Sequence, residues 1–457
     1  MFRGKFLHRE EFMKGSKKAT IQLILLFLLV VSIIGAGYHY FDWEKPTISQ
    51  DKPFDTIGKE KDVTITLRDG RSGIRSYTVA IEQNKQEFVL ASEQIPSKGT
   101  HEKVVAVKII PKDLKIKDGE AVFKIEVTDF SPLRNSSLLQ AKVTIDSIPP
   151  RIALLTRAHN INPGGTCLTV YRVTKAVQVS GVKCGNTFFP GYLVQGKAKP
   201  YYVCFFAIPM EVKTSTPMAV TVEDKAGNHA IVGIPFYIRS VRPFRRDTIT
   251  VSDSFVQQKA VEFQEQESKL AGKSAEEVFT YVNTQLRMYD DKRIQEVCAK
   301  TSGKQLWQGT FLRLKKGAPR ALFGDQRTYQ YQGKSMGTSV HLGIDLASTT
   351  HAPIEAANSG IVLYADNMGI YGNCVIIDHG QGISSQYGHM SSIAVKAGQQ
   401  VTKGQIIGNT GVTGFAGGDH LHFSILAGGV FVDPKEWWDP HWIRDNVQDK
   451  FEIANTL

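Results

Sequence analysis

Five residues in the last third of the chain have the types and spacing of a metal-dependent hydrolytic site. They are His341, Asp345, His389, His420 and His422. Two imidazoles and one carboxylate form a zinc ligand set that leaves a coordination position open for water. We therefore expect this block to carry the chemistry, and the rest of the chain to anchor and present it.

Strands are the elements expected to position these side chains. In a strand, residues two or four positions apart share one face, so His341 and Asp345 would point into one space, as would His420 and His422. A helix would also bring His341 and Asp345 together. Gly343 and the β-branched neighbours favour the strand.

The N-terminus has the pattern of a membrane anchor. Residues 1–18 carry six Lys or Arg against two Glu, and residues 19–40 are almost continuously apolar. Such a run can cross a hydrocarbon core of ~30 Å as a helix, and the preceding basic residues place the N-terminus in the cytoplasm. A cleaved signal peptide is the competing interpretation, but no clear cleavage site follows the run. The later domains are therefore expected in the periplasm or cell envelope, attached to the cytoplasmic membrane by one pass.

Two β-rich units of ~100 residues each are expected after this anchor, at 45–147 and 148–244. Alternating apolar residues such as Val63, Ile65 and Leu67 indicate half-buried strands. The two units echo each other loosely, and the second resembles bacterial immunoglobulin-like spacer domains through Pro149-Pro150 and the run from Asp224 to Asn228.

Between residues 252 and 302 the spacing of apolar residues changes from the alternation of strands to a helical period. Ser274 and Glu277 have the spacing of a capping box, and apolar residues then recur at helical intervals. We interpret this stretch as a helical connector. A partner-binding helix is the alternative.

Composition and cysteine usage restrict the function classes. The chain has 457 residues, 42% of them hydrophobic, and a formal net charge of +11. No zinc-finger, helix-turn-helix or RNA-binding pattern accompanies this basic excess, so nucleic acid is not expected as a partner. The five cysteines lack metal-binding spacing. Three of them, Cys167, Cys184 and Cys204, fall in the second β unit, where one disulfide such as Cys184–Cys204 is expected if the compartment is oxidising; the sequence alone does not fix the pairing.

The order of the site motifs identifies a family resemblance. His341-x-x-x-Asp345 precedes Tyr387-Gly-His389-Met, and His420-x-His422 follows. With the glycine-rich segments around them, they resemble the lysostaphin-type (LytM-like) zinc metallopeptidases over roughly residues 307–440. The resemblance implies one zinc ion per chain, with His341, Asp345 and His422 as ligands and His389 and His420 as catalytic residues. One catalytic histidine would act as general base and the other would stabilise the oxyanion; their assignment is open. His351, His379 and His441 are expected to be bystanders.

The predicted architecture is mostly β. It comprises a cytoplasmic tail (1–18), a transmembrane signal anchor (19–40), two tandem β-sandwich spacers (45–147 and 148–244), a helical connector (252–302) and an antiparallel-β metallopeptidase domain (305–445). The resemblance implies an endopeptidase that hydrolyses peptide cross-links of cell-wall peptidoglycan. The alternative is a catalytically silent or autoinhibited regulator or scaffold of other cell-wall hydrolases, with envelope partners that the sequence does not identify. A peptidase acting on another glycine-containing envelope or secreted protein is a third interpretation.

Overall fold

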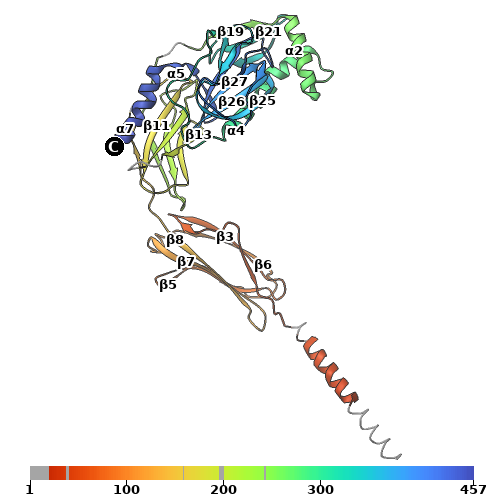
Figure 1. Ribbon diagram of the computed structural model, residues 1–457. Helices are drawn as coiled ribbons and strands as arrows, with labels where there is room; N and C mark the ends of the chain where they lie inside the picture. Colours follow the sequence, from red (N-terminus) through yellow and green to blue (C-terminus); the bar gives the residue numbers. More distant parts are fainter. Residues whose placement is uncertain are drawn as a thin grey trace, which may run out of the picture. The chain divides into compact units, whose positions relative to one another are not determined.

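The computed structural model describes residues 20–35, 37, 41–157, 159–194, 200–240 and 243–456. The chain forms two compact units (Figure 1). The first comprises Met1–Ile148 with Lys225–Asn228, and the second comprises Pro149–Asp224 with His229–Leu457. Strands dominate both units and helices are few, so the prediction of a mostly β protein is confirmed.

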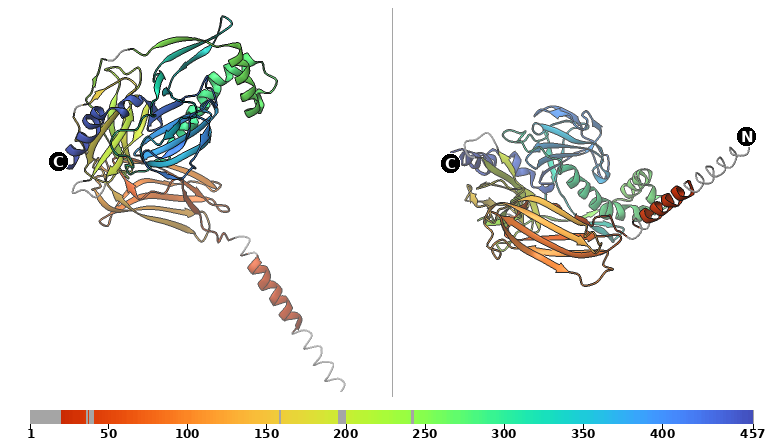
Figure 2. Two further views of the ribbon diagram at one scale, coloured as in Figure 1. Left: turned by 45° about the horizontal axis from the view of Figure 1, so that its top comes forward. Right: turned by 90° about the horizontal axis from the view of Figure 1, so that it is seen from below.

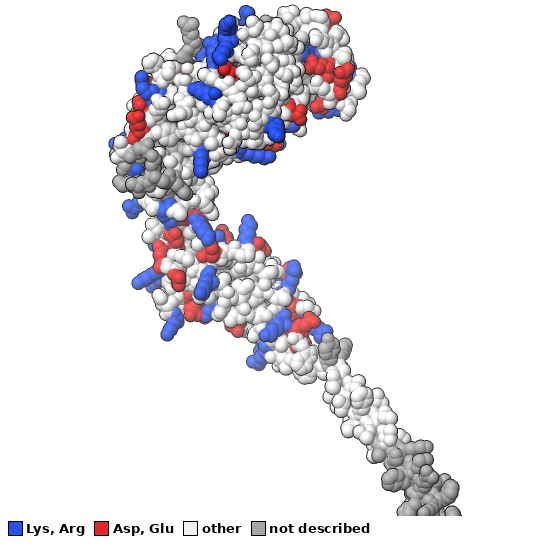
Figure 3. All heavy atoms as spheres, in the orientation of Figure 1, with Lys and Arg blue, Asp and Glu red and all other residues white. Residues whose placement is uncertain are grey.

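Residues 20–35 form a helix whose large apolar side chains are exposed. Figure 3 shows this helix without charged side chains. The predicted span 19–40 is described only at residues 20–35 and 37, and the predicted tail at 1–18 lies outside the described residues. Among the described residues, no helix combines the length and apolarity needed to cross a membrane.

The first unit is a sandwich of two sheets around one core. One sheet has the order β1 (Thr47–Gln50), β3 (Lys61–Arg68) and β6 (Glu102–Ile109). The other has the order β2 (Thr56–Ile57), β8 (Ser136–Ile145), β7 (Gly119–Asp129), β4 (Ile74–Gln83) and β5 (Gln86–Gln94). Val63, Ile65 and Leu67 of β3 are buried with Phe123 and Ile125 of β7 in this core. The alternation in the sequence thus corresponds to inward- and outward-facing strand positions.

The second unit begins with two four-stranded sheets. One has the order β14 (Tyr192–Val194), β15 (Tyr201–Ala207), β11 (Thr166–Val173) and β9 (Ile152–Leu154). The other has the order β13 (Thr187–Pro190), β12 (Val179–Cys184), β16 (Met218–Glu223) and β17 (His229–Gly233). A short parallel pair, β10 (Asn160–Ile161) and β18 (Tyr237–Ile238), adjoins them.

The Cys184–Cys204 disulfide that the sequence predicts is absent. All five cysteines are free and buried. Cys184 lies on β12 and Cys204 on β15, which belong to different sheets, and the Cys204 thiol points to the carbonyl oxygen of Phe189 at 3.3 Å. Burial raises the pKa of the Cys184 thiol to about 11, so these side chains act as small apolar core residues.

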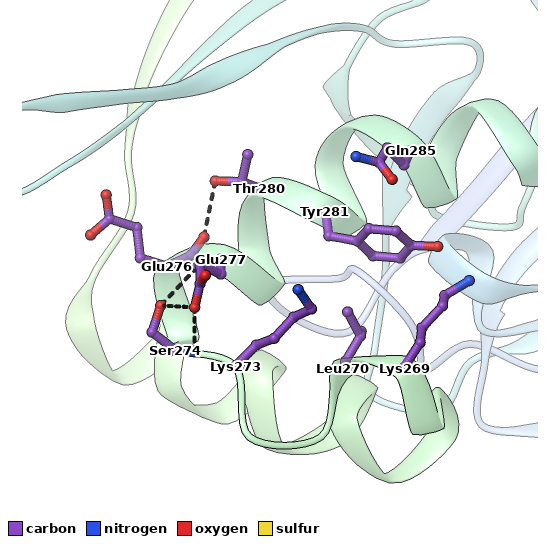
Figure 4. A pocket seen from close by; sticks show the side chains of 9 residues that line it. All are labelled: Lys269, Leu270, Lys273, Ser274, Glu276, Glu277, Thr280, Tyr281 and Gln285. Carbon is purple, nitrogen blue, oxygen red and sulfur yellow. Dashed lines mark hydrogen bonds between the residues drawn. The ribbon is translucent and has the colours of Figure 1, made fainter.

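The helical connector lies beside the blue sheet that carries the site (green, Figure 2). It contains α2 (Asp253–Gln266), η1 (Ser268–Leu270), α3 (Ala275–Tyr281), η2 (Val282–Leu286) and α4 (Arg287–Cys298). The predicted capping box is present: Ser274 Oγ accepts from the Glu277 amide at 3.2 Å, and a Glu277 carboxylate oxygen accepts from the Ser274 amide at 2.8 Å (Figure 4). Nearby, Lys269 Nζ lies 4.9 Å from the ring centroid of Tyr281. The turn between α2 and α3 is therefore fixed by its own side chains.

An eight-stranded antiparallel sheet carries the candidate site. Its order is β20 (Ala318–Ala321), β23 (Ile344–Ala347), β31 (Leu421–Ala427), β27 (Ile383–Met390), β26 (Asn373–Gly380), β25 (Gly360–Asn367) and β29 (Gln400–Val401), with β32 (Val430–Val432) paired to β31. Two smaller sheets flank it. They are β19 (Arg246–Thr250), β21 (Gln326–Tyr331) and β22 (Lys334–Val340), and β24 (Pro353–Glu355), β30 (Ile406–Asn409) and β28 (Ser392–Ile393).

The strands between residues 152 and 238 share one core with this sheet and with the C-terminal helices. The Phe205 ring lies 6.3 Å from Trp307 and 6.0 Å from Trp437, measured between ring centroids. Glu436, on α5 (Pro434–Trp438), is buried against the same strands. Its carboxylate accepts from Asn162 Nδ2 at 2.7 Å and from the Thr166 amide at 2.6 Å. The second unit therefore buries a polar contact as well as a continuous apolar core.

Candidate metal centre

Three side chains converge on one point of the eight-stranded sheet. His341 Nε2 lies 2.9 Å from Asp345 Oδ1 and 3.1 Å from His422 Nδ1. His422 Nδ1 lies 2.9 Å from the same carboxylate oxygen. The structure thus brings together the three residues that the family resemblance implies as metal ligands.

Strand register explains two of the three positions. Asp345 on β23 pairs directly with His422 on β31, and Gly388 on β27 pairs with His422 from the other side. His341 differs from the prediction because it lies between β22 and β23 rather than within a strand. The bend passes through Gly343, where an added Cβ would lie 2.6 Å from His422 Nε2. Any larger residue at this position would displace the His422 ring.

A hydrogen bond to a backbone carbonyl sets the tautomer of His341, and a contact with a serine hydroxyl orients His422. A carbonyl oxygen can only accept, so His341 Nδ1 donates to Leu322 O at 2.9 Å and leaves Nε2 as the ligand atom. His422 Nε2 lies 3.1 Å from Ser424 Oγ, which leaves Nδ1 facing the site. Such contacts orient histidine ligands in metal sites.

This donor set fits a zinc ion. Zinc bonds to nitrogen and oxygen at about 2.0–2.2 Å in a tetrahedron, which places neighbouring ligand atoms about 3.3 Å apart. The three observed separations, 2.9, 2.9 and 3.1 Å, need only small adjustments to reach that value. The donors are two nitrogens and one oxygen, which leaves one tetrahedral position for a fourth ligand.

Burial and neighbouring charges shift the pKa values in this cluster. For Asp345, burial raises the pKa, but the electrostatic interaction with His341 and the hydrogen-bond contacts with His341, His420 and His422 outweigh it and hold the pKa well below the usual range. Burial lowers the pKa of His422 to about 4. The cluster therefore presents an ionised carboxylate and a neutral imidazole, which are the protonation states of metal ligands.

His389 and His420 lie together beside the three ligands. Their ring centroids are 4.8 Å apart, and the His389 ring is 5.8 Å from His422. His389 Nδ1 donates to Thr413 O at 2.8 Å, and His420 Nδ1 donates to Gly418 O at 2.7 Å, so proton transfer falls to the Nε2 atoms. His420 Nε2 lies 3.5 Å from Asp345 Oδ1. His389 also has a φ of +62°, a strained conformation of the kind found at functional sites.

The other nearby histidines lie away from the cluster. His351 is exposed in a turn, and its Nδ1 donates to Thr410 O at 3.1 Å. His379 is fully buried between Ser359 O and Ser385 Oγ, and burial lowers its pKa to about 4. His441 is exposed on α6 (Pro440–Ile443).

Two arginines border the cavity around the metal ligands, and no sequence pattern predicted a role for either. The cavity has a volume of about 120 Å³, and its lining includes Arg287, Arg327, Tyr329 and Tyr371. Arg327 Nη2 donates to Asp345 Oδ2 at 3.3 Å, the carboxylate oxygen that faces away from the other ligands. Arg327 lies on β21 and Arg287 at the start of α4, so their approach depends on tertiary packing.

The connector holds the two loops that border this cavity. Asp290 Oδ2 accepts from the Ile370 amide at 2.7 Å, and Asp291 Oδ1 accepts from the Tyr371 hydroxyl at 2.9 Å. On the other side, the buried Lys259 Nζ donates to Gly414 O at 2.5 Å. The helices predicted as a connector are thus structural parts of the cavity walls.

A second group of acidic residues has a different character. Asp42, Asp69 and Asp129 are buried and lie within 4.8 Å of one another in the first unit. Their carboxylates accept from backbone amides, among them Gly73 N to Asp69 at 2.7 Å and Ser131 N to Asp129 at 3.1 Å. Hydrogen bonds that fix turns account for these contacts.

The fold and the site together define a metallopeptidase-type domain, and comparisons with known proteins identify it further. Residues 339–434 match the family described as Peptidase family M23. This chain therefore carries a peptidase family M23 domain of the lysostaphin and LytM type, as the sequence resemblance predicted.

Characterised relatives match over the same part of the chain. The Peptidoglycan DD-endopeptidase ShyA of Vibrio cholerae is 39% identical over 89 residues, which are 20% of this chain and 21% of the relative. The DD-carboxypeptidase/endopeptidase Mpg of Neisseria meningitidis is 36% identical over 95 residues, 21% of this chain and 22% of the relative. This chain thus spans about a fifth of the length of the relatives it matches.

Among solved structures, the catalytic domain of lysostaphin from Staphylococcus simulans is similar to this chain. It is 28% identical, the match covers 28% of this chain and 96% of that domain, and the TM-score is 0.24.

Proposed function

We propose that this protein is a zinc endopeptidase that hydrolyses peptide cross-links of cell-wall peptidoglycan. The observation that carries the proposal is the convergence of His341, Asp345 and His422, with His389 and His420 beside them. Peptidoglycan as the substrate is supported by the similar proteins ShyA and ShyC of Vibrio cholerae, which are named peptidoglycan DD-endopeptidases.

In this proposal, each residue of the cluster has a chemical task. His341, Asp345 and His422 would hold one zinc ion, which when bound supplies Lewis acidity that polarises a carbonyl and lowers the pKa of water. The pair His389 and His420 would move the proton between the attacking water and the leaving amine and would stabilise the negative oxygen. No carboxylate other than Asp345 lines the described cavity, so the proton-transfer role falls to these imidazoles.

Product analysis tests this proposal directly. Zinc-loaded full-length protein is incubated with purified peptidoglycan, and the released fragments are identified by mass spectrometry. We expect newly formed amino and carboxyl ends at a peptide cross-link. We expect His389→Ala and His420→Ala to retain zinc but to reduce the rate at least 100-fold, since general acid–base catalysis contributes about 10²–10⁴-fold. Fragments with intact cross-links, or unchanged rates in both variants, would contradict the assignment.

The cavity volume supports a second candidate, a restrained or silent member of the family. About 120 Å³ is the space of roughly four water molecules. Phe415, which lines the cavity, packs at a centroid distance of 4.9 Å from Phe279 of the connector. This alternative predicts that zinc-loaded protein releases no fragments, so cleavage by the unmodified chain would reject the silent form.

We further propose that residues 19–40 anchor the protein in the cytoplasmic membrane and that the later domains face the cell envelope. Support comes from the exposed apolar side chains of residues 20–35 and from the basic residues that precede them in the sequence. Expression in a bacterium followed by alkaline extraction of membranes tests the proposal. Recovery of the full-length chain in the soluble fraction would contradict the anchor.

A further inference from the structure

The groups around the metal ligands would carry more positive charge than is needed to bind a neutral peptide bond. The charged side chains other than histidine that line the described cavity are Arg287, Arg327 and Asp345. A zinc ion at the proposed ligands would add two positive charges to one carboxylate and two guanidinium groups. With the histidines neutral, the groups that line the cavity would then carry three excess positive charges. The carboxylates of Asp290 and Asp291, which interact with Arg287 from the connector, would offset two of them, and the remaining positive charge in a site of low dielectric favours an anion.

The two arginines differ in their ion-pair and hydrogen-bond partners. Arg327 forms an ion pair with Asp345, and the Arg327 side chain is only 18% exposed. Arg287 is half-buried, and its Nε and Nη2 donate to the oxygen and the Oδ1 of Asn283 at 3.3 and 3.2 Å. Within the described part of the chain, Arg287 forms no ion pair shorter than 4.0 Å. Its remaining donors are therefore available to a ligand in the cavity.

The position of Arg287 is held by the backbone and by buried neighbours. It follows the π-helical turn η2, and π-helical turns are frequent at functional sites. Asn283, which receives its two hydrogen bonds, is 1% exposed. Nearby, Asp290 accepts a hydrogen bond from the Ile370 amide, and Asp291 accepts one from the Tyr371 hydroxyl. The centroid of the Tyr371 ring lies 5.3 Å from that of the His422 ring. Arg287 thus borders the cavity on the side of the ligand His422.

We propose that Arg287 binds a carboxylate of the substrate, on the residue next to the scissile peptide bond. This inference rests on the proposed peptidase function and specifies its substrate class: peptides with a free carboxylate beside the cleaved bond, in preference to peptides in which that group is an amide. The connector, outside the residues that match the family, would then supply a specificity-determining side chain.

Two synthetic peptides that differ in one group test this inference. Both contain the same cross-link, and the residue next to the scissile bond carries either a free carboxylate or the primary amide. The zinc-loaded full-length protein should have at least a tenfold higher kcat/KM for the carboxylate peptide, because hydrogen bonds to charged groups contribute about 1.5–3 kcal/mol. Arg287→Gln should abolish this preference mainly through KM, and Arg287→Lys should restore part of it.

The controls separate a specific role from a general effect. Lys292→Gln removes an exposed cation from the same helix and should leave the preference unchanged. Equal thermal midpoints would show that Arg287→Gln is folded. A second measurement, the affinity of non-cleavable analogues of both peptides for the zinc-loaded protein, does not require turnover. Discrimination in binding without cleavage would support Arg287 while rejecting the proposed function. Equal affinity and equal kcat/KM for the two peptides, or binding of neither analogue, would overturn the inference.

Discussion

At the scale of single residues, the site is a small set of side chains whose hydrogen bonds leave one atom of each facing the cluster. Leu322 O fixes His341, Ser424 Oγ contacts His422, and Arg327 holds the outer oxygen of Asp345. These contacts leave His341 Nε2, His422 Nδ1 and Asp345 Oδ1 as the three inward atoms. The ligand geometry therefore depends on residues that do not bind the metal.

Arg327 offers a test of this dependence. Arg327→Gln removes the charge that holds Asp345 Oδ2, so Asp345 should lose its fixed orientation. We expect zinc affinity to fall roughly 10- to 100-fold, the usual effect of removing a group that orients a ligand. Competition with a metal-binding dye measures this affinity. Arg320→Gln, an exposed arginine on β20, is the matched control and should bind zinc as the wild type does. Equal affinities in both variants would show that Arg327 does not orient Asp345.

Local spacing pairs His341 with Asp345 and His420 with His422 in the sequence. The family resemblance added His389 and divided the five residues into ligands and catalytic groups. His420 and His422 are two positions apart, and both contribute to the cluster. His341 shows the limit of such reasoning, since a bend at Gly343, rather than a continuous strand, directs it inward. Arg287 and Arg327 had no local signal, because only packing of the connector and β21 against the sheet brings them to the cavity.

At the scale of elements, α5 is attached to the strands around residues 160–170 through a buried carboxyl group. Glu436 is 7% exposed, and burial raises its pKa to about 8. An unfolded chain would have the ordinary value of about 4.5 for this residue. Between these two values the folded state holds a proton that the unfolded state releases, so stability falls as pH rises.

Glu436→Gln should remove this pH dependence. For the wild type, the free energy of unfolding of the second unit should decrease between pH 5 and pH 8, by up to about 1.4 kcal/mol per pH unit from this residue. The glutamine variant cannot release a proton and should show a flatter profile. Denaturant titrations at several pH values measure the difference between the two proteins. Parallel profiles would contradict a raised pKa for Glu436.

The elements themselves were predicted to different degrees. The helical connector and its capping box follow from periodicity and from the Ser274–Glu277 spacing. Local sequence patterns did not predict two features: the absence of a Cys184–Cys204 disulfide and the continuous core from Phe205 to Trp437. Both depend on which sheets face each other. Local patterns predict which positions are buried, and they do not predict their partners across the core.

At the scale of the whole molecule, the two compact units have separate hydrophobic cores. Calorimetry should therefore resolve two unfolding transitions. Phe123→Ala, at a fully buried position of the first unit, should destabilise one transition by about 3–5 kcal/mol. Zinc at 100 times its dissociation constant should stabilise the other by about 2.7 kcal/mol. If zinc shifted the same unfolding transition that Phe123→Ala destabilises, the assignment of the two transitions to separate units would be contradicted.

The central claim is that His341, Asp345 and His422 form a zinc site that cleaves peptide cross-links. The most direct measurement compares zinc content and fragment release from peptidoglycan for wild type, His422→Ala and His351→Ala, the last being an exposed histidine outside the cluster. We expect about one zinc per chain and cross-link cleavage in wild type and His351→Ala, and loss of both in His422→Ala. Equal zinc content and equal fragment release in all three proteins would contradict the claim.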